Sequence, residues 1–213
     1  MSNKPANSAQ IYLITPQFDD RDAFASLFEA ALSSVPVAAV LIAPRDAGDA
    51  SDTYQNDCKL LTPIAQKHGA AVLTMNDTQV SGRANADGIH LTSNLKELKE
   101  IASRFQPQRI VGAGAIHSKH DAMEMGEALP DYLFFGDPFE SEGSNRDEAV
   151  ELASWWADLF EVPCVAMGGT SENTLQETIA TGIDFVGVRT FVWQHPEGPE
   201  AAIKAVHKLL SAR

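Results

Sequence analysis

The stretch Val162–Val188, VPCVAMGGTSENTLQETIATGIDFVGV, constrains the fold of this chain more than any other. It opens with an apolar run, Val162–Met167, of the kind that forms a fully buried strand. Two glycines follow, and Ser171 is a suitable N-cap for a helix over Glu172–Thr181. A second buried strand is predicted at Asp184–Val188. Strand, glycine turn, helix and strand together form one βαβ unit.

The glycine turn of this unit, Gly168-Gly169, is a predicted anion site. Two glycines at the carboxyl end of a parallel strand leave peptide N–H groups uncovered, and a helix begins just after them, which suits a phosphate. The next strand ends in Gly187, Val188, Arg189 and Thr190, whose backbone is placed to close the other side of the site. Arg189 would add a charge-assisted contact. The alternative is a simple tight turn beside a solvated arginine.

The rest of the chain repeats the same alternation of strand and helix. Eight apolar runs have the character of strands: Ile11–Thr15, Val37–Ala43, Ala70–Met75, Gly88–Leu91, Arg109–Ala113, Tyr132–Gly136, Val162–Met167 and Asp184–Val188. Helical patterns separate most of them and close the chain: Arg21–Ser34, Thr53–His68, Leu95–Phe105, Lys119–Ala128, Asp147–Phe160, Glu172–Thr181 and Pro199–Ala212. Eight βα units predict an α/β fold, a single (βα)₈ TIM barrel, with a doubly wound open sheet as the alternative.

Length and charge restrict the classes of function. The 213 residues suit one barrel domain over residues 11–213, preceded by a flexible polar tail over residues 1–10. The net charge of −13 argues against nucleic acid and against anionic membranes as partners, but leaves room for a small phosphorylated substrate. No transmembrane span or signal peptide is recognisable, and the two cysteines, Cys58 and Cys164, are not placed to pair, so we expect a reducing cytoplasm.

A barrel requires its functional residues to follow the strands, at the carboxyl face. Asn76 and Asp77 come directly after the third strand, where they are candidates for substrate and metal binding, although both residue types also favour plain turns. His90 lies within the fourth strand and is either a barrel-layer residue or a substrate contact. His117 follows the fifth strand, where it is either a proton shuttle or a loop residue that caps the next helix.

Several motifs in this order resemble the thiamine phosphate synthase family, which includes the thiazole tautomerases as a sister group. The motifs are Asn76-Asp77, Ala86–Leu91 (ADGIHL), Asp131–Gly136 (DYLFFG) and Val165–Gly169 (VAMGG). The resemblance extends from Ile11 to the last helix and implies a (βα)₈ barrel. It also implies, as a family property only, a homodimer.

The resemblance implies a coupling of two phosphorylated heterocycles in thiamine biosynthesis. The synthases join hydroxymethylpyrimidine pyrophosphate to thiazole phosphate with loss of pyrophosphate, in a reaction that needs Mg²⁺ and cations on the leaving group. The turn Gly168-Gly169 and the strand end Gly187–Thr190 match the family's thiazole-phosphate cradle. Asp77 matches one metal ligand.

The pyrophosphate half of the site departs from the family pattern. The synthases carry Gln-x-Arg-x-Lys at the end of the second strand, whereas this chain has Leu41–Arg45 and keeps a charge only at Arg45, the lysine position. The segment Thr92–Leu95 lacks the family's second carboxylate. Ser141 occupies a threonine-like place in the loop after the sixth strand and is a candidate substrate contact, but Glu142–Ser144 supplies no cation.

Three functions therefore stand. The first is a thiamine phosphate synthase with Arg45 in the catalytic site. The second is a thiazole phosphate tautomerase that uses His117 as its general acid and base, as the sister group uses a histidine after the fifth strand. The third is a non-catalytic binder of a phosphorylated thiamine intermediate. Turnover of the pyrimidine pyrophosphate separates the first function from the other two.

Overall fold

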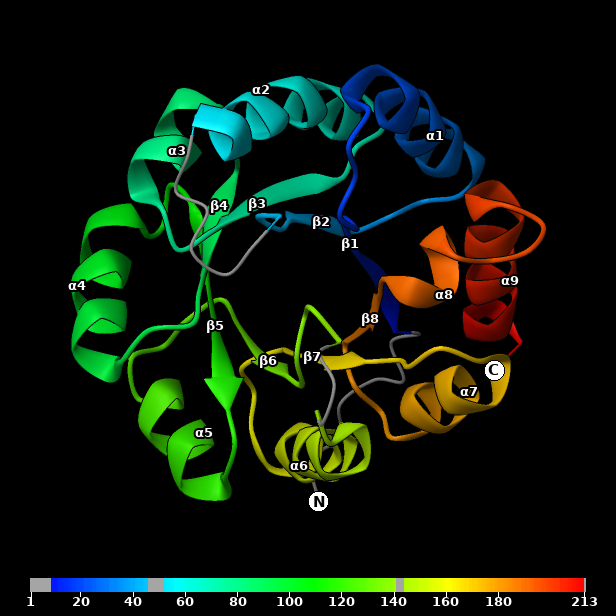
Figure 1. Ribbon diagram of the computed structural model, residues 1–213. Helices are drawn as coiled ribbons and strands as arrows, with labels where there is room; N and C mark the ends of the chain where they lie inside the picture. The colour runs from blue at the N-terminus through cyan, green and yellow to red at the C-terminus, as the bar shows by residue number, and fades with distance from the viewer. Residues whose placement is uncertain (1–8, 46–51, 141–143, 213) are drawn as a thin grey trace.

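The computed structural model describes residues 9–45, 52–140 and 144–212. Within them, parallel strands β1 to β8 close into a barrel that the helices surround (Figure 1). The strands are β1 Gln10–Ile14, β2 Ala39–Ile42, β3 Ala71–Met75, β4 Gly88–Leu91, β5 Ile110–Ile116, β6 Tyr132–Phe135, β7 Cys164–Met167 and β8 Phe185–Val188. The helices are α1 Arg21–Ser34, α2 Asp52–Lys67, α3 Thr78–Arg83, α4 Leu95–Phe105, α5 Lys119–Gly126, α6 Arg146–Leu159, α7 Glu172–Ala180, α8 Thr190–Trp193 and α9 Pro199–Ser211.

The pairing of β1 with both β2 and β8 confirms the barrel and rules out the open sheet. Tyr12 is opposite Ala39 of β2 on one side and opposite Gly187 of β8 on the other. The predicted strand and helix bounds differ from the observed ones by a few residues. The short helices α3 and α8 are not among the predicted helices, because six and four residues are too few to show a helical period.

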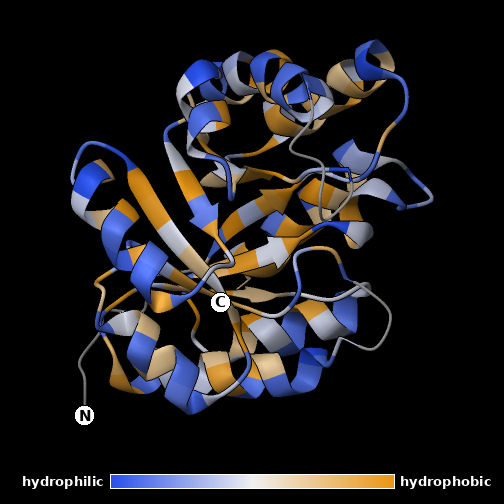
Figure 2. Ribbon diagram, turned by 60° about the vertical axis from the view of Figure 1, so that its left-hand side comes forward, coloured by the Kyte–Doolittle hydropathy of each residue, from blue (hydrophilic) through white to orange (hydrophobic). Residues whose placement is uncertain are grey.

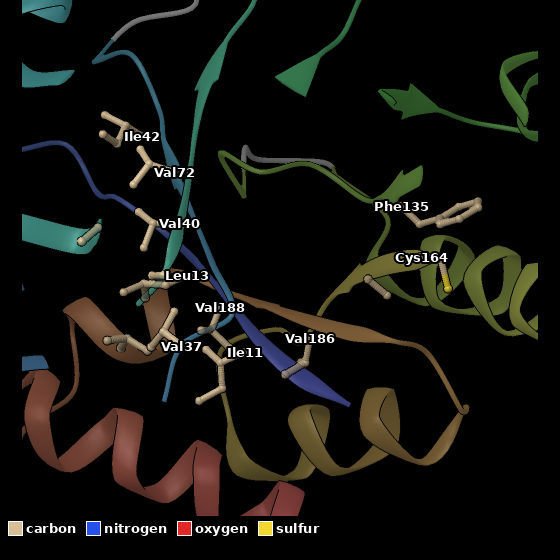
Figure 3. Packing of buried hydrophobic residues seen from close by; sticks show 14 of the residues in the cluster. Ile11, Leu13, Val37, Val40, Ile42, Val72, Phe135, Cys164, Val186 and Val188 are labelled. Carbon is tan, nitrogen blue, oxygen red and sulfur yellow. The ribbon is translucent and has the colours of Figure 1, made fainter. Parts of the chain in front are cut away.

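The strands are apolar on both faces because each face is buried in a different core. Ile11 and Leu13 of β1 point outward and pack with the surrounding helices, in a cluster that Figure 3 shows in part. Tyr12 and Ile14 of the same strand point into the barrel interior. Figure 2 shows that the strands are mostly hydrophobic and that the surrounding helices carry many hydrophilic residues. No helix in the described part of the chain is long and apolar enough to span a bilayer.

An aspartate recurs at the amino ends of three strands, β4, β6 and β8. Asp87 precedes β4, and its carboxylate accepts from the Val72 N–H at 2.7 Å. Asp131 precedes β6 and accepts from the Val111 N–H at 2.7 Å. The Asp184 carboxylate, before β8, accepts from the Cys164 N–H at 3.0 Å, so the same contact is made three times. These carboxylates satisfy backbone donors where three strands begin, at the face opposite the predicted functional residues.

Candidate active site

A cavity of about 840 Å³ opens at the carboxyl ends of the strands. We call it the mouth cavity. Residues from the ends of β3, β4, β5, β6 and β7 line it, among them Met75, Thr92, His117, Gly136 and Gly169. Ligand sites of (βα)₈ barrels occur at this face, so the mouth cavity is the candidate ligand site.

The glycine turn after β7 presents free backbone donors to the mouth cavity. Gly169 has a φ of +80°, and both Gly169 and Thr170 line the cavity. Among the described residues their N–H groups have no hydrogen-bond partner. Ser171 and Thr174 form a capping box that fixes the first turn of α7 just beyond them. The turn can therefore accept an anion through backbone N–H groups next to a helix N-terminus.

Two other glycines of the predicted phosphate site have a role in the sheet. The Gly168 N–H donates to the Gly187 carbonyl at 2.8 Å, across the β7–β8 pair. A Cβ on Gly168 would lie 2.4 Å from Leu175 Cδ2, so the absence of a side chain lets α7 pack against the strands. In this structure the Gly168 N–H is not available to a ligand.

The end of β8 contacts the loop after β6. Arg189 is half-buried, and its guanidinium donates to the Thr15 carbonyl at 3.2 Å and to the Phe139 carbonyl at 2.5 Å. The Thr190 N–H donates to the Glu140 carboxylate at 3.0 Å. Burial lowers the pKa of Arg189, and the nearby negative charges of Glu140 and Asp137 oppose that shift. Protein groups therefore already occupy this side of the predicted phosphate cradle.

Arg146 lines the mouth cavity beside the glycine turn and was not predicted from the sequence. Its Nη2 donates to the Thr174 carbonyl at 2.5 Å and to Thr178 Oγ1 at 2.7 Å. A Cβ on Gly169 would lie 3.0 Å from Arg146 Cδ. The predicted helix began one residue later, and Asn145, which caps α6, was the signal that would have included Arg146.

Asn76 joins the ends of β3 and β4. Its Nδ2 donates to Thr92 Oγ1 at 2.8 Å, and its Oδ1 accepts from the Thr92 N–H at 2.8 Å. These two hydrogen bonds hold Asn76 at a φ of 57°, next to Met75 and Thr92, which line the mouth cavity. The carboxylate of Asp77 accepts from the Gln79 and Val80 N–H groups and caps α3.

His117 is exposed and lines the mouth cavity. Ser118, not His117, caps α5, because the Ser118 hydroxyl accepts from the Asp121 N–H at 3.1 Å. The His117 N–H donates to the Asp121 carboxylate at 3.1 Å, which fixes the backbone. The imidazole has no hydrogen-bond partner among the described residues, so it is available to a ligand in the cavity.

His90 lies in the barrel interior, below the mouth cavity. Its Nδ1 is 3.0 Å from the Tyr132 hydroxyl, which in turn is 2.8 Å from the Tyr12 hydroxyl. Its Nε2 is buried with no hydrogen-bond partner among the described residues and lies next to Gly114. Burial lowers the pKa of His90 to about 3, so the imidazole is neutral at physiological pH.

The low pKa of His90 makes stability depend on pH. Unfolded His90 takes up a proton near pH 6.5 and folded His90 only near pH 3, so stability present above pH 6.5 is lost as the pH falls toward 3. The unfolding free energy of the wild type should fall between pH 7 and pH 5. In a His90→Gln variant, whose residue 90 does not titrate, we expect this fall to be smaller by about 1–2 kcal/mol. Urea unfolding at both pH values measures this difference. His120→Gln, at an exposed position, should behave as wild type, and equal losses in wild type and His90→Gln would contradict the assignment.

Arg45 is bound in an ion cluster at the end of β2. Its Nε and Nη2 lie 3.0 Å and 3.2 Å from the two carboxylate oxygens of Asp57. Arg21 Nε contacts the same carboxylate at 2.5 Å. Two guanidinium groups therefore share one carboxylate, so this cluster of three side chains carries a net positive charge. Ser141, the remaining predicted site residue, lies outside the described residues.

Comparisons with known proteins agree with the geometry. A family model described as thiamine monophosphate synthase matches residues 11–192. A thiamine-phosphate synthase of Rhodospirillum centenum is 32% identical over 204 residues, covering 94% of this chain and 97% of the relative. One from Hyphomonas neptunium is 32% identical over 214 residues, covering 98% and 97%. A solved thiamine phosphate pyrophosphorylase from Pyrococcus furiosus covers 98% of both chains at 22% identity with a TM-score of 0.75, which supports the fold.

Proposed function

This chain belongs to the thiamine monophosphate synthase family, and we propose that it forms thiamine phosphate from hydroxymethylpyrimidine pyrophosphate and thiazole phosphate. In this reaction the bond between the pyrimidine methylene carbon and the pyrophosphate oxygen breaks, and the thiazole nitrogen bonds to that carbon. The observation that carries the proposal is the set of free donors at the Gly169-Thr170 turn, which opens into the mouth cavity. Positioning two substrates in one cavity is the main contribution that such chemistry asks of the protein.

We assign the thiazole phosphate to the turn after β7. The N–H groups of Gly169 and Thr170 and the N-terminus of the nine-residue helix α7 would hold its phosphate oxygens. Arg146 lies against the same turn. Its guanidinium also contacts the carboxylates of Asp147 at 2.8 Å and Glu177 at 3.3 Å, so Arg146 would position the turn and not add an unpaired positive charge.

We assign the pyrimidine pyrophosphate to the opposite side, between the ends of β2 and β4. Arg45 would stabilise the departing pyrophosphate, because the Arg21–Arg45–Asp57 cluster keeps a net positive charge there. Asn76, held by Thr92, would contact the pyrimidine. Ser141 remains a predicted substrate contact.

Magnesium is implied by the family, and the described residues do not form a site for it by themselves. The described residues contain no group of three His, Cys, Asp or Glu side chains able to hold a metal ion. Asp77 remains the predicted protein ligand, but its Oδ1 is already engaged by two backbone N–H groups. A bound Mg²⁺ would thus depend on substrate phosphates for most of its ligands.

The test of the synthase proposal is turnover. Wild-type protein would be incubated with both substrates and Mg²⁺, and thiamine phosphate would be measured by chromatography. Formation of thiamine phosphate in proportion to enzyme is the expected result. Binding of thiazole phosphate without any product would overturn the synthase and favour a tautomerase or a binder.

A thiazole tautomerase is the second candidate, because the His117 imidazole is available in the mouth cavity. If it is the general acid and base, a His117→Asn variant should lose about 100-fold or more in isomerisation rate and still bind thiazole phosphate. Proton exchange on the thiazole, followed by NMR, measures the rate. His120→Asn, at an exposed position on the first turn of α5, is the matched control. An unchanged rate in His117→Asn would exclude this role.

We also propose a cytoplasmic location and a homodimer. The thiols of Cys58 and Cys164 are buried and not in a disulfide, and burial raises the pKa of the Cys58 thiol to about 12, so it stays protonated. The dimer rests on the family resemblance, and sedimentation of the purified protein tests it.

A further inference from the structure

The loop after β6 closes over the end of β8 through charged and polar contacts. The Glu140 carboxylate accepts from the Thr190 N–H at 3.0 Å. Arg189 donates to the Phe139 carbonyl at 2.5 Å, and its guanidinium carbon lies 5.9 Å from the centre of the Phe139 ring. We call these three interactions the β6–β8 contact. Neither Arg189 nor Thr190 is among the described residues that line the mouth cavity.

The chemistry of this contact is that of a bound phosphate. A negatively charged oxygen accepts from a backbone N–H at the end of a barrel strand, beside a guanidinium group. Under the proposed function, a ligand's phosphate held at the Gly169-Thr170 turn would seek donors on the neighbouring strand end as well. The side chain of Glu140 takes that second position.

The local backbone directs Glu140 toward β8. The Phe139 N–H donates to the Asp137 carboxylate at 2.8 Å, and the Glu140 N–H donates to the Asp137 carbonyl at 3.1 Å. Glu140 has a φ of 51°, a left-handed conformation that is uncommon for a residue other than glycine. The two hydrogen bonds to Asp137 therefore hold the turn in the conformation that places Glu140 next to β8.

The negative charge of Glu140 also disfavours a phosphate at the position that its side chain occupies. The carboxylates of Asp137 and Glu140 both act on the half-buried Arg189, so two negative charges face one positive charge. A phosphate that approached with Glu140 in place would meet a net negative charge. With Glu140 displaced, the Thr190 N–H and more of the Arg189 charge would become available to the phosphate.

We propose that Glu140 competes with the ligand's phosphate for the Thr190 N–H and for Arg189, and so sets the affinity of the site for phosphorylated ligands. This inference rests on the proposed function, because it takes the phosphate to lie between the ends of β7 and β8. It makes Glu140 a specificity-determining residue: its carboxylate disfavours phosphorylated ligands over their unphosphorylated counterparts.

Calorimetric titration with two probes tests the competition. The probes are thiazole phosphate and the corresponding thiazole alcohol, which lacks the phosphate. A Glu140→Ala variant should bind thiazole phosphate about tenfold more tightly than wild type, since one charge-assisted hydrogen bond no longer has to be replaced. Its affinity for the alcohol should be unchanged. Glu140→Gln, which keeps an oxygen acceptor but loses the charge, should give a smaller gain.

Glu148→Ala is the matched control. Glu148 lines the mouth cavity as Glu140 does, although it is exposed and Glu140 is half-buried, and its carboxylate has no hydrogen-bond partner among the described residues. This variant removes the same charge without touching the β6–β8 contact, so its affinity for thiazole phosphate should change by about twofold at most.

Three results would overturn the inference. The first is an unchanged or weaker affinity of Glu140→Ala for thiazole phosphate. The second is an equal gain for the alcohol, which would mean that the variant simply opens the cavity. The third is no binding of thiazole phosphate to any variant, since there would then be no phosphate to compete. Product formation by wild type alongside either of the first two results would leave the synthase proposal standing and remove only the role of Glu140.

Discussion

Replacing Asp57 with alanine should lower the free energy of unfolding by about 3 kcal/mol. The Asp57 carboxylate is almost fully buried and is contacted by Arg21 and by Arg45. Without it, two guanidinium groups would face each other with no anion between them. The cost lies at the low end for a broken buried ion pair, because the Arg21 and Arg45 side chains are 39% and 21% exposed and keep some access to water.

Urea unfolding followed by circular dichroism measures this loss. Asp57→Asn keeps the shape of the side chain and removes the charge, so it should lose most of the same stability. Arg21→Gln is the matched control, because Arg45 still pairs with Asp57 in that variant, and we expect a loss of about 1 kcal/mol. A loss below 1 kcal/mol in Asp57→Ala would show that the cluster does not stabilise the barrel.

Replacing Gly169 with alanine should weaken binding of thiazole phosphate about 100-fold, which corresponds to the loss of two charge-assisted hydrogen bonds. Gly169 has a φ of +80°, which a side chain disfavours. An added Cβ would also lie 2.6 Å from Thr174 Oγ1 and 3.0 Å from Arg146 Cδ. The turn would have to shift, and its N–H groups would no longer converge on one phosphate.

Gly182→Ala separates this effect from backbone strain alone. Gly182 follows α7 with a φ of +85°, but a Cβ there would meet nothing within 4 Å. We expect this variant to lose about 1 kcal/mol of stability and to bind thiazole phosphate as wild type does. Calorimetric titration measures the affinity and thermal unfolding the stability. Wild-type affinity in Gly169→Ala would mean that the phosphate does not bind at this turn.

Much of the fold could be predicted from the sequence because its signals are local. An apolar run marks each strand, and a cap such as Ser171 marks where a helix begins. Closure of the barrel is different, since the β1–β8 pair joins residues more than 170 positions apart. Repetition of the βα unit and the family resemblance supplied that part of the prediction.

The candidate site was predicted less completely, because its contacts join distant segments. The sequence identifies Arg45 and Arg189 as charged residues at strand ends, but not that Asp57 and the Phe139 carbonyl bind them. Arg146 was missed because its position beside the glycine turn depends on how α6 packs against α7. Glycines in a motif are likewise ambiguous, since Gly169 presents a donor to the cavity while Gly168 pairs across the sheet.

The aspartates that precede β4, β6 and β8 bear on how a barrel of this kind can diverge. Asp87 and Asp131 belong to the motifs ADGIHL and DYLFFG, by which the chain resembles its family. Yet both carboxylates bind backbone donors at the amino end of the barrel, away from the mouth cavity. Some of the motif residues by which the chain resembles its family therefore hold the ends of strands in place and do not bind a ligand. Loops at the carboxyl end, such as the one that carries Glu140, can therefore change and alter ligand specificity, while the motifs at the amino end keep the family resemblance recognisable.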